Sequence, residues 1–259
     1  MPNTINNVTH YDSNYITNVI FRVDFPNIIE LDIREPTAEF QRRIVEKFPR
    51  VNPLKRDLVN FQIQPNEVKT GKEEEYAWEF FNKENNKKIF LTSDHASIEY
   101  FNHYTRFKEL LDDIELVFKA IFELYPVKIA ERVGLRYINQ IEMQGSDVYN
   151  WENLINKHLY SLTDEFTSEN DEVQRSMHLL EVNEEGHSLK FQFGLFNSDY
   201  PNTISRKEFV LDYDCSTTQP TEVSEVSNLA EKFNVIIYKW FDKSIENGLK
   251  EKMGVQNAT

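Results

Sequence analysis

The sequence is poor in the residues that mark several common protein classes. Its 259 residues contain 7 glycines and a single cysteine, Cys215. One cysteine excludes a framework of intrachain disulfides and is typical of a reducing compartment. Because no histidine lies near it in the sequence, we expect Cys215 to be chemically inert. The scarcity of glycine argues against the glycine-rich loops that bind nucleotide phosphates.

Long apolar runs are also missing. No segment approaches the roughly 18 apolar residues that a membrane-spanning helix needs. The first residues, Met1 to Ser13, are polar and lack the basic and apolar regions of a signal peptide. We therefore predict a cytoplasmic protein that is not associated with a membrane.

Positive charge is scarce relative to negative charge. The chain has 43 acidic and 29 basic residues, which gives a formal net charge of −14. Such a surface repels phosphate backbones and anionic lipids, so direct binding of nucleic acid is disfavoured. The same surface suits plain solubility, or docking onto a basic surface of a protein partner. Both interpretations stay open.

Aromatic residues are abundant, with 19 Phe and 12 Tyr, and hydrophobic residues make up 40% of the chain. This composition supports the core of one large domain or of two packed halves. We expect a flexible N-terminus over residues 1–14, an N-terminal half over 15–162 and a C-terminal half over 163–259, packed as one unit. The acidic segment 163–172 is the expected hinge.

Hydrophobic periodicity predicts the elements of the first half. Alternation predicts a strand over 15–25 and another over 58–64, where Val59, Phe61 and Ile63 share a face. A helix follows Pro36, and the charged, glycine-containing segment 69–75 is expected to be a turn. Three short strands (76–81, 88–93 and 97–101) and a long helix over 104–125 follow, before the strand expected over 131–142.

The first half ends with a helix expected over 150–162. The second half repeats the order of three strands and a helix, with strands over 173–182, 188–196 and 208–214 and a final helix from Ser227 that Gly254 caps. The third strands of the two sets look alike, Ile98-Glu99-Tyr100 against Leu211-Asp212-Tyr213. We predict an α+β fold in which antiparallel sheets carry long helices on one face, built from a duplicated strand-strand-strand-helix unit.

The strand expected over 131–142 holds the candidate binding residues. Arg132 and Arg136 are four positions apart, an even step, so both side chains point to one face of a strand. A guanidinium on a central strand needs a carboxylate or an anionic ligand, because a buried unpaired charge is costly. Glu99 and Asp212 are the expected partners in an internal network, and contact with an anion or a protein partner is the alternative. Tyr137 and Asn139 share the strand and complete the candidate set.

No metal-binding or nucleophile pattern stands out, so we predict no metal and no cofactor. A nuclease-like alternative would combine Asp57 with Glu67-Val68-Lys69, since two carboxylates and a lysine can hold a divalent cation and a water. These residues are also typical of a solvated loop. A histidine-based site would use His95 or His103, with Asp94 beside His95. His178 fits a sheet position and His187 a hairpin turn.

The segment Arg132-Val133-Gly134-Leu135-Arg136-Tyr137-Ile138-Asn139 resembles a motif of a sporadically distributed family of uncharacterised bacterial proteins. Members of that family carry an Arg-x-Gly-Leu-Arg-Tyr-x-Asn strand after a long helix, and begin with an alternating strand similar to residues 16–25. The family has no established activity. Its patchy distribution implies a role in phage defence or in a toxin–antitoxin pair.

Our leading hypothesis from the sequence is a non-enzymatic binding or regulatory protein that acts with a protein partner. The first alternative is a metal-dependent hydrolase or nuclease that uses scattered acidic residues with His95 or His103. The second is a self-assembling structural protein, a homo-oligomer in which a sheet edge pairs with itself.

Overall fold

The computed structural model describes residues 10–31, 37–64, 67–145, 147–166 and 173–256, with the backbone alone at residues 10, 37, 56–75, 164, 166, 255 and 256. The contacts divide the chain into two compact units. One comprises Ile20–Gly134 and Gln219–Ala230, and the other comprises Met1–Val19, Leu135–Thr218 and Glu231–Thr259. In the described part of the chain, no helix has the length and apolar character to cross a bilayer.

Nine strands form an antiparallel sheet in the order β3-β4-β5-β6-β2-β8-β11-β10-β9, so the end strands are β3 and β9. The strands are β2 (Ile16–Asp24), β3 (Arg50–Gln64), β4 (Glu67–Phe81), β5 (Lys87–Leu91), β6 (His95–Phe101), β8 (Arg132–Met143), β9 (Ser176–Glu184), β10 (His187–Leu195) and β11 (Lys207–Ser216). Together with the helices, this sheet confirms the predicted α+β class.

Five α-helices and three 3-10 helices accompany the strands in the described residues. The α-helices are α1 (Thr37–Ile44), α2 (Phe107–Leu124), α3 (Ser161–Phe166), α4 (Val226–Ser244) and α5 (Asn247–Met253). The 3-10 helices are η1 (Ile29–Leu31), η2 (Lys157–Leu159) and η3 (Val223–Glu225). Two small sheets pair β1 (His10–Tyr11) with β13 (Val255–Gln256), and β12 (Thr221–Glu222) with β7 (Ile129–Ala130).

The core of the first unit lies between strands and α2. Alternation in β2 buries Phe21 and Val23, as the period of two predicts. The apolar stripe of α2 is buried along its length, and the Phe21 ring meets Phe118 of α2 edge to face at 5.4 Å. Aromatic pairs in this geometry add to the free energy gained by burying their surface.

The core of the second unit is built on β10, β11 and α4. Phe191 of β10 stacks on Tyr213 of β11 with ring centroids 4.5 Å apart. Two residues of α4 pack against them: Trp240 lies 6.0 Å from Phe191, and Phe241 lies 6.5 Å from Tyr213. These edge-to-face contacts place the apolar stripe of α4 on this part of the sheet, as the 3.6-residue periodicity predicts.

The predicted turn over residues 69–75 is wrong, because β4 runs through it. The strands β3 and β4 pair at fifteen positions, from Arg50 opposite Phe81 to Gln64 opposite Glu67. Pairing with a neighbouring strand overrides the weak strand preference of the local run of charged residues. The predicted shared face of residues 59, 61 and 63 concerns side chains outside those described.

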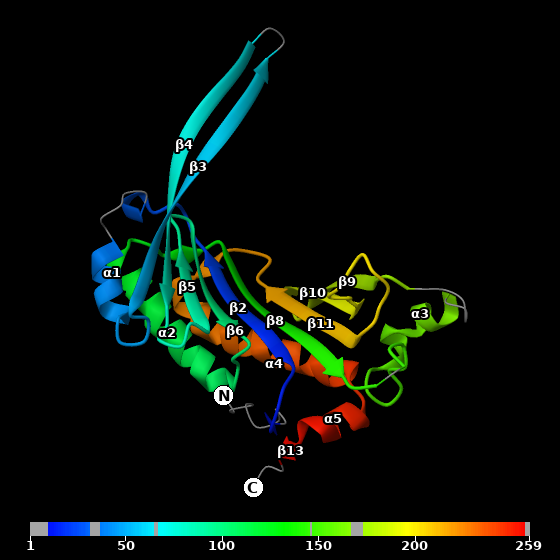
Figure 1. Cartoon of the computed structure of the whole chain (residues 1–259). Coiled ribbons are helices and arrows are strands. Elements are labelled where there is room, and N and C mark those ends of the chain that lie inside the picture. Colours follow the sequence, from blue (N-terminus) through cyan, green and yellow to red (C-terminus); the bar gives the residue numbers. More distant parts are fainter. Residues whose placement is uncertain (1–9, 32–36, 65–66, 146, 167–172, 257–259) are drawn as a thin grey trace. The chain divides into compact units, whose positions relative to one another are not determined.

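In the described residues, a third strand pairs with this long hairpin only at its base. The next strand, β5, pairs with β4 at the four positions from Trp78 to Phe81. Residues 56–64 and 67–75, which we call the arm, lie beyond those pairs and beyond the pair formed by Lys55 and Tyr76. Figure 1 shows the arm extending well past β5.

The predicted helix over 150–162 is also wrong. Its first part is a series of turns, followed by η2 and the short α3. The reason lies in the Asp and Asn side chains, which accept hydrogen bonds from nearby backbone N–H groups and so compete with helix formation. The Asp147 carboxylate accepts from the N–H groups of residues 149 and 150, Asn150 accepts from residue 152, and Asn156 accepts from residue 158.

The two ends of the chain differ from prediction in one respect each. Part of the expected flexible N-terminus is ordered: residues 10 and 11 form β1, and the Asp12 N–H donates to the Gly254 carbonyl at 3.0 Å. The expected final helix is divided into α4 and α5, because Ile245 forms a β-bridge with Ile155. Gly254 follows α5 with a φ of +71°, which confirms the predicted cap.

The predicted duplication has a counterpart in the strand order. Three successive strands followed by a long helix occur twice, as β4-β5-β6-α2 and as β9-β10-β11-α4, although β12 and η3 intervene between β11 and α4. The duplication itself stays a prediction, because a shared order of elements does not establish a common origin. The compact units also differ from the predicted halves, since residues 135–162 group with the C-terminal strands.

We expect Phe21→Ala to lower the free energy of unfolding by about 3–5 kcal/mol, because it leaves a cavity at a fully buried ring. Urea unfolding at equilibrium measures this change. Ile29→Ala is the control in the same unit: Ile29 is 75% exposed, and its truncation should cost less than about 0.5 kcal/mol. Equal losses in the two variants would contradict this description of the core.

Candidate functional site

The predicted pairing of Arg136 with Asp212 is present. The Arg136 guanidinium on β8 donates from Nε to Oδ1 of Asp212 at 2.8 Å and from Nη2 to Oδ2 at 2.6 Å. The hydrogen bonds to Asp212 raise the pKa of Arg136 above its ordinary value, although burial alone would lower it. Asp212 is nearly buried, whereas the Arg136 side chain is 39% exposed. This two-pronged pair ties β8 to β11.

Arg132 lies at the other end of the motif, and its position explains the glycine. A Cβ atom at Gly134 would come within 2.8 Å of Nη1 of Arg132. The guanidinium therefore occupies the space beside the Gly134 backbone that any larger residue would fill. In Arg-x-Gly, the glycine makes room for the arginine two residues earlier.

The remaining predicted residues of the set are used within the fold. The Tyr137 hydroxyl donates to Oδ1 of Asn234 on α4 at 3.0 Å, and the buried Asn139 amide donates to the Leu211 carbonyl at 3.1 Å. Glu99, expected to meet an arginine, instead forms an ion pair with Lys88 at 3.2 Å and accepts from Ser97. The structure thus joins Arg136 to Asp212 and places Glu99 in a separate ion pair.

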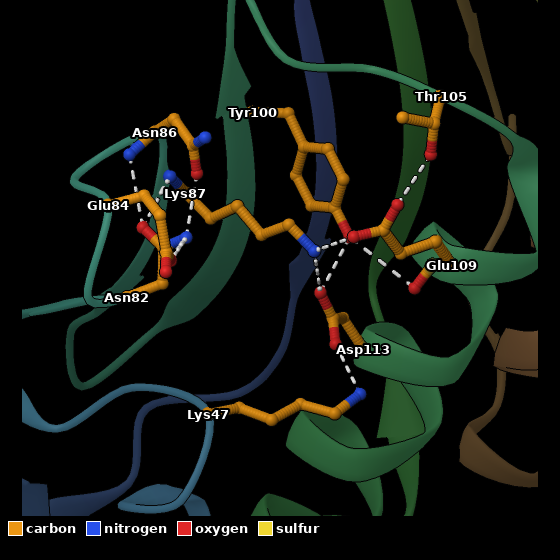
Figure 2. Close-up of polar contacts among 9 residues, drawn as sticks. All are labelled: Lys47, Asn82, Glu84, Asn86, Lys87, Tyr100, Thr105, Glu109 and Asp113. Atoms are coloured by element: carbon orange, nitrogen blue, oxygen red, sulfur yellow. Dashed lines mark hydrogen bonds and ion pairs between the residues drawn. The ribbon is translucent and has the colours of Figure 1, made fainter.

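A second charged cluster, which the sequence analysis missed, lies where α2 packs on β5 and β6 (Figure 2). At its centre is Asp113, whose side chain is 1% exposed. Its carboxylate accepts hydrogen bonds from Nζ of Lys47 at 2.6 Å, from Nζ of Lys87 at 3.0 Å and from the Tyr100 hydroxyl at 2.5 Å. Three donors on one buried carboxylate offset its loss of hydration. We call Lys47, Lys87, Tyr100, Glu109 and Asp113 the Asp113 cluster.

Lys87 is the second hub of the Asp113 cluster. Its ammonium group also contacts Oε1 of Glu109 at 2.6 Å and lies 4.3 Å from the centre of the Tyr100 ring. Burial, together with the nearby Asp113 charge, raises the pKa of Tyr100 well above its ordinary value. The phenol is therefore neutral at physiological pH and acts as a hydrogen-bond donor.

Glu109 links the cluster to solvent. Burial alone would raise the pKa of Glu109, but hydrogen bonds from Lys87 and Thr105 outweigh it and hold the pKa below its ordinary value. The Thr105 hydroxyl donates to Oε2 of Glu109 at 2.5 Å (Figure 2). Glu109 is thus ionised at neutral pH, and its charge complements Lys87.

A cavity of about 470 Å³ opens beside the Asp113 cluster, lined in part by Asn82, Asn86 and His103. The Asn82 side chain orders its rim: Oδ1 accepts from the N–H groups of Asn86 and Lys87, both at 3.0 Å. Arg50 donates to the Asn82 carbonyl at 2.6 Å and so fixes the loop to β3. The members of the Asp113 cluster bind one another, so the cluster braces α2 against β5 and β6.

A larger cavity, of about 710 Å³, lies among the turns that replace the predicted helix. Tyr149, Trp151 and Tyr160 line it together with the carboxylates of Glu152 and Glu246. The lining also contains the Asp147 carboxylate and the ammonium group of Lys157, so aromatic, acidic and basic side chains meet there.

The other residues considered as catalytic candidates lie apart or are engaged locally. Asp57 is opposite Glu74 in the hairpin, so seven residues of β4 separate it from Glu67, a distance of roughly 24 Å along a strand. Nδ1 of His95 bonds Oδ1 of Asp94 at 2.6 Å. Burial would raise the pKa of Asp94, but hydrogen bonds from His95 and Thr92 lower it. In the described residues, no group of three His, Cys, Asp or Glu side chains could hold a metal ion.

The other two histidines and the cysteine have local roles. His178 stacks on Phe193 at 5.3 Å, as expected for a sheet residue, and His187 meets Phe233 edge to face at 5.1 Å. Burial lowers the pKa of His187. Cys215 is buried, which agrees with the expectation that it is inert.

Comparison with known proteins adds no family. Neither the protein-family models nor the curated proteins give a match to this chain. The resemblance of the β8 motif described above therefore stays a prediction.

We expect Arg136→Ala to lower the free energy of unfolding by about 1–3 kcal/mol, because it leaves the nearly buried Asp212 carboxylate without its donor. Arg136→Lys keeps the charge but lacks the planar fork, so it should recover only part of the loss. Urea unfolding of both variants at neutral pH measures the difference. An unchanged stability in the alanine variant would show that the pair does not support the fold.

We expect Asp113→Asn to cost about 3 kcal/mol of unfolding free energy, because it removes the negative charge that Lys47 and Lys87 share inside the protein. Asp112→Asn is the matched control. Asp112 is the neighbouring residue and pairs with Lys108 on the surface of α2, so its substitution should leave the free energy of unfolding nearly unchanged. Thermal and urea unfolding measure the stability of the two variants. Similar losses of unfolding free energy in both would contradict the central role of Asp113.

Glu109 should make stability depend on pH in the acid range. Its pKa is lower in the folded protein than its ordinary value, so its contribution is present above the unfolded pKa and is lost as the pH falls through the folded pKa. The difference between the wild type and Glu109→Gln should be below about 1 kcal/mol at neutral pH and should vanish in acid. A difference that grew as the pH fell would have the wrong sign.

Proposed function

We propose that this protein is a non-enzymatic binding protein that acts with a protein partner, and that the β3–β4 arm makes the main contact. The observation that carries the proposal is the arm itself: fifteen strand pairs, of which four are backed by β5. A two-stranded hairpin alone is marginally stable in water, so a long one that leaves its sheet gains stability from a surface to pack on.

The backbone of the arm also offers a means of recognition. β3 is an end strand of the sheet, and β4 lies next to β5 only at its base. The outer edges of both strands therefore carry backbone N–H and C=O groups without a neighbouring strand in the described residues. Addition of a strand to such an edge is a common way to bind an extended segment of another protein.

The charge of the chain indicates the kind of partner. A net charge of −14 favours association with a basic surface and disfavours nucleic acid. The resemblance of the β8 motif suggests a setting in phage defence or a toxin–antitoxin pair, in which a neighbouring gene would encode the partner.

Deletion of the arm tests this proposal. Residues 56–75 are replaced by Asn-Gly, which closes the paired Lys55 and Tyr76 with a two-residue turn that suits a hairpin. We expect the variant to unfold at nearly the wild-type temperature and to lose a stoichiometric partner that wild-type protein retains. Co-expression with the neighbouring genes, native purification and mass measurement of the complex provide the readout.

The exposed Ile29→Ser variant, in the same unit, is the control that should keep the partner. Full retention of the partner by the arm deletion would refute the role of the arm. A wild-type protein that purifies alone and turns over a substrate would refute the binding function itself.

A further inference from the structure

The opposite end strand, β9, has an unusual edge. β9 is last in the strand order, and in the described residues no strand lies beyond it. Natural proteins protect such edges with lysine, proline or bulges, yet the segment Ser176–Glu184 contains neither lysine nor proline. Instead it exposes two adjacent leucines, Leu179 at 55% and Leu180 at 43%. This edge is open to pairing with another strand.

The turn after β9 fixes which backbone groups face outward. Glu185 and Gly186 both have positive φ values, +52° and +85°, as a two-residue hairpin turn requires. Such a turn is closed by a hydrogen-bonded pair, here Glu184 and His187. Because hydrogen-bonded and non-bonded pairs alternate along a hairpin, the N–H and C=O groups of residues 177, 179, 181 and 183 point away from β10.

Charge does not protect this edge either. The two carboxylates of β9 are each paired with a lysine of the same unit: Glu181 with Lys190 at 3.0 Å and Glu184 with Lys239 at 2.5 Å. The strand is therefore close to neutral on a chain that carries a net charge of −14. Repulsion between two copies is weakest at such a place.

We infer that β9 pairs antiparallel with β9 of a second copy of this chain, around a two-fold axis at Leu180. In this register Leu180 faces its own copy, Leu179 faces Glu181, and Met177 faces Asn183. The outward-pointing groups of residues 177, 179, 181 and 183 then bond one another, and no two like charges lie opposite. The strand is thus complementary to itself, as a two-fold interface requires.

Packing favours the same register. Leu180 lies opposite the buried Phe191 in the β9–β10 pairing, and His178 lies opposite Phe193. Residues opposite each other in a hairpin share a face, so Leu180 extends the apolar layer of Phe191 and Phe193 to the end of the sheet. Pairing of two copies buries the exposed Leu180 side chains against each other at the end of that layer.

Sedimentation at two protein concentrations, in about 0.15 M salt to screen the net charge, tests the interface. We expect wild-type protein to be a dimer that dissociates on dilution. Leu180→Lys should raise the dissociation constant at least about ten-fold, because two ammonium groups then face each other. Val235→Lys is the matched control, a 46% exposed apolar residue on α4 of the same unit, and should leave the dimer unchanged.

A cysteine scan tests the register and does not depend on the lysine variant. Leu180→Cys places two thiols at a non-bonded pair with Cα atoms about 4.5 Å apart, which a disulfide can bridge. Val182→Cys lies on the same face but two residues from the axis, so its two copies would be about 14 Å apart along the strands. Mild oxidation should cross-link the first variant and not the second, since the native Cys215 is buried.

A monomer at all concentrations, or equal cross-linking of the two cysteine variants, would overturn the inference. A dimer that Leu180→Lys leaves intact would do the same. The test of the dimer is independent of the test of the binding proposal, because deletion of residues 56–75 leaves β9 in place. The arm-deleted protein should still dimerise even if the arm proves to bind nothing.

Discussion

A buried carboxylate is the constraint on which the unit of residues 20–134 depends. Asp113 lies on the apolar stripe of α2, where an unpaired charge would cost several kcal/mol. Helix α2 is therefore stable only in a position that brings the Asp113 carboxylate to Lys47, Lys87 and Tyr100. The helix is placed on β5 and β6 by this requirement as well as by its apolar contacts. Charge thus specifies the packing as much as burial does.

The same principle acts in the other unit through a different pair. Arg136 and Asp212 join β8 to β11 with two hydrogen bonds, and Asn139 of β8 bonds the carbonyl of Leu211 beside them. In each unit these charged groups on and beside the sheet bind partners within the same unit: Arg136 binds Asp212, and Lys47 and Lys87 bind Asp113. In the described residues, the outer edges of the end strands, β3 and β9, have no neighbouring strand. This distribution supports the proposal that the protein interacts through its sheet edges.

The sequence predicted the elements that follow a clean period. The strand β2, the helix α2 and the hairpin β9–β10 lie close to their predicted positions, because alternation and the 3.6-residue stripe reflect burial directly. The Arg136–Asp212 pair was also predictable, since an arginine on a central strand must meet a carboxylate. Glu99 was assigned the wrong partner because a likeness between two strands carries no information on what lies opposite each.

The failures have equally specific causes. The helix expected over 150–162 gave way to turns because Asp147, Asn150 and Asn156 bind the backbone locally. The arm was missed because a run of charged residues was interpreted as a turn, whereas pairing with a neighbouring strand can override weak local strand preference. The Asp113 cluster was missed although one signal was present, an acidic residue within the buried stripe of a helix. Such a residue implies buried cations, but their positions depend on tertiary packing.

Hydrogen exchange of the backbone amides tests the central claim, that the arm is an element held for a partner. In the isolated protein, we expect fast exchange over residues 56–64 and 67–75. Exchange should be slow in β5 and β6, because each of these strands has a neighbouring strand on both sides. In the complex with its partner, the amides of the arm should become protected while those of β5 and β6 stay unchanged. An arm that is as protected as β5 in the isolated protein, or that stays unprotected in the complex, would contradict the account.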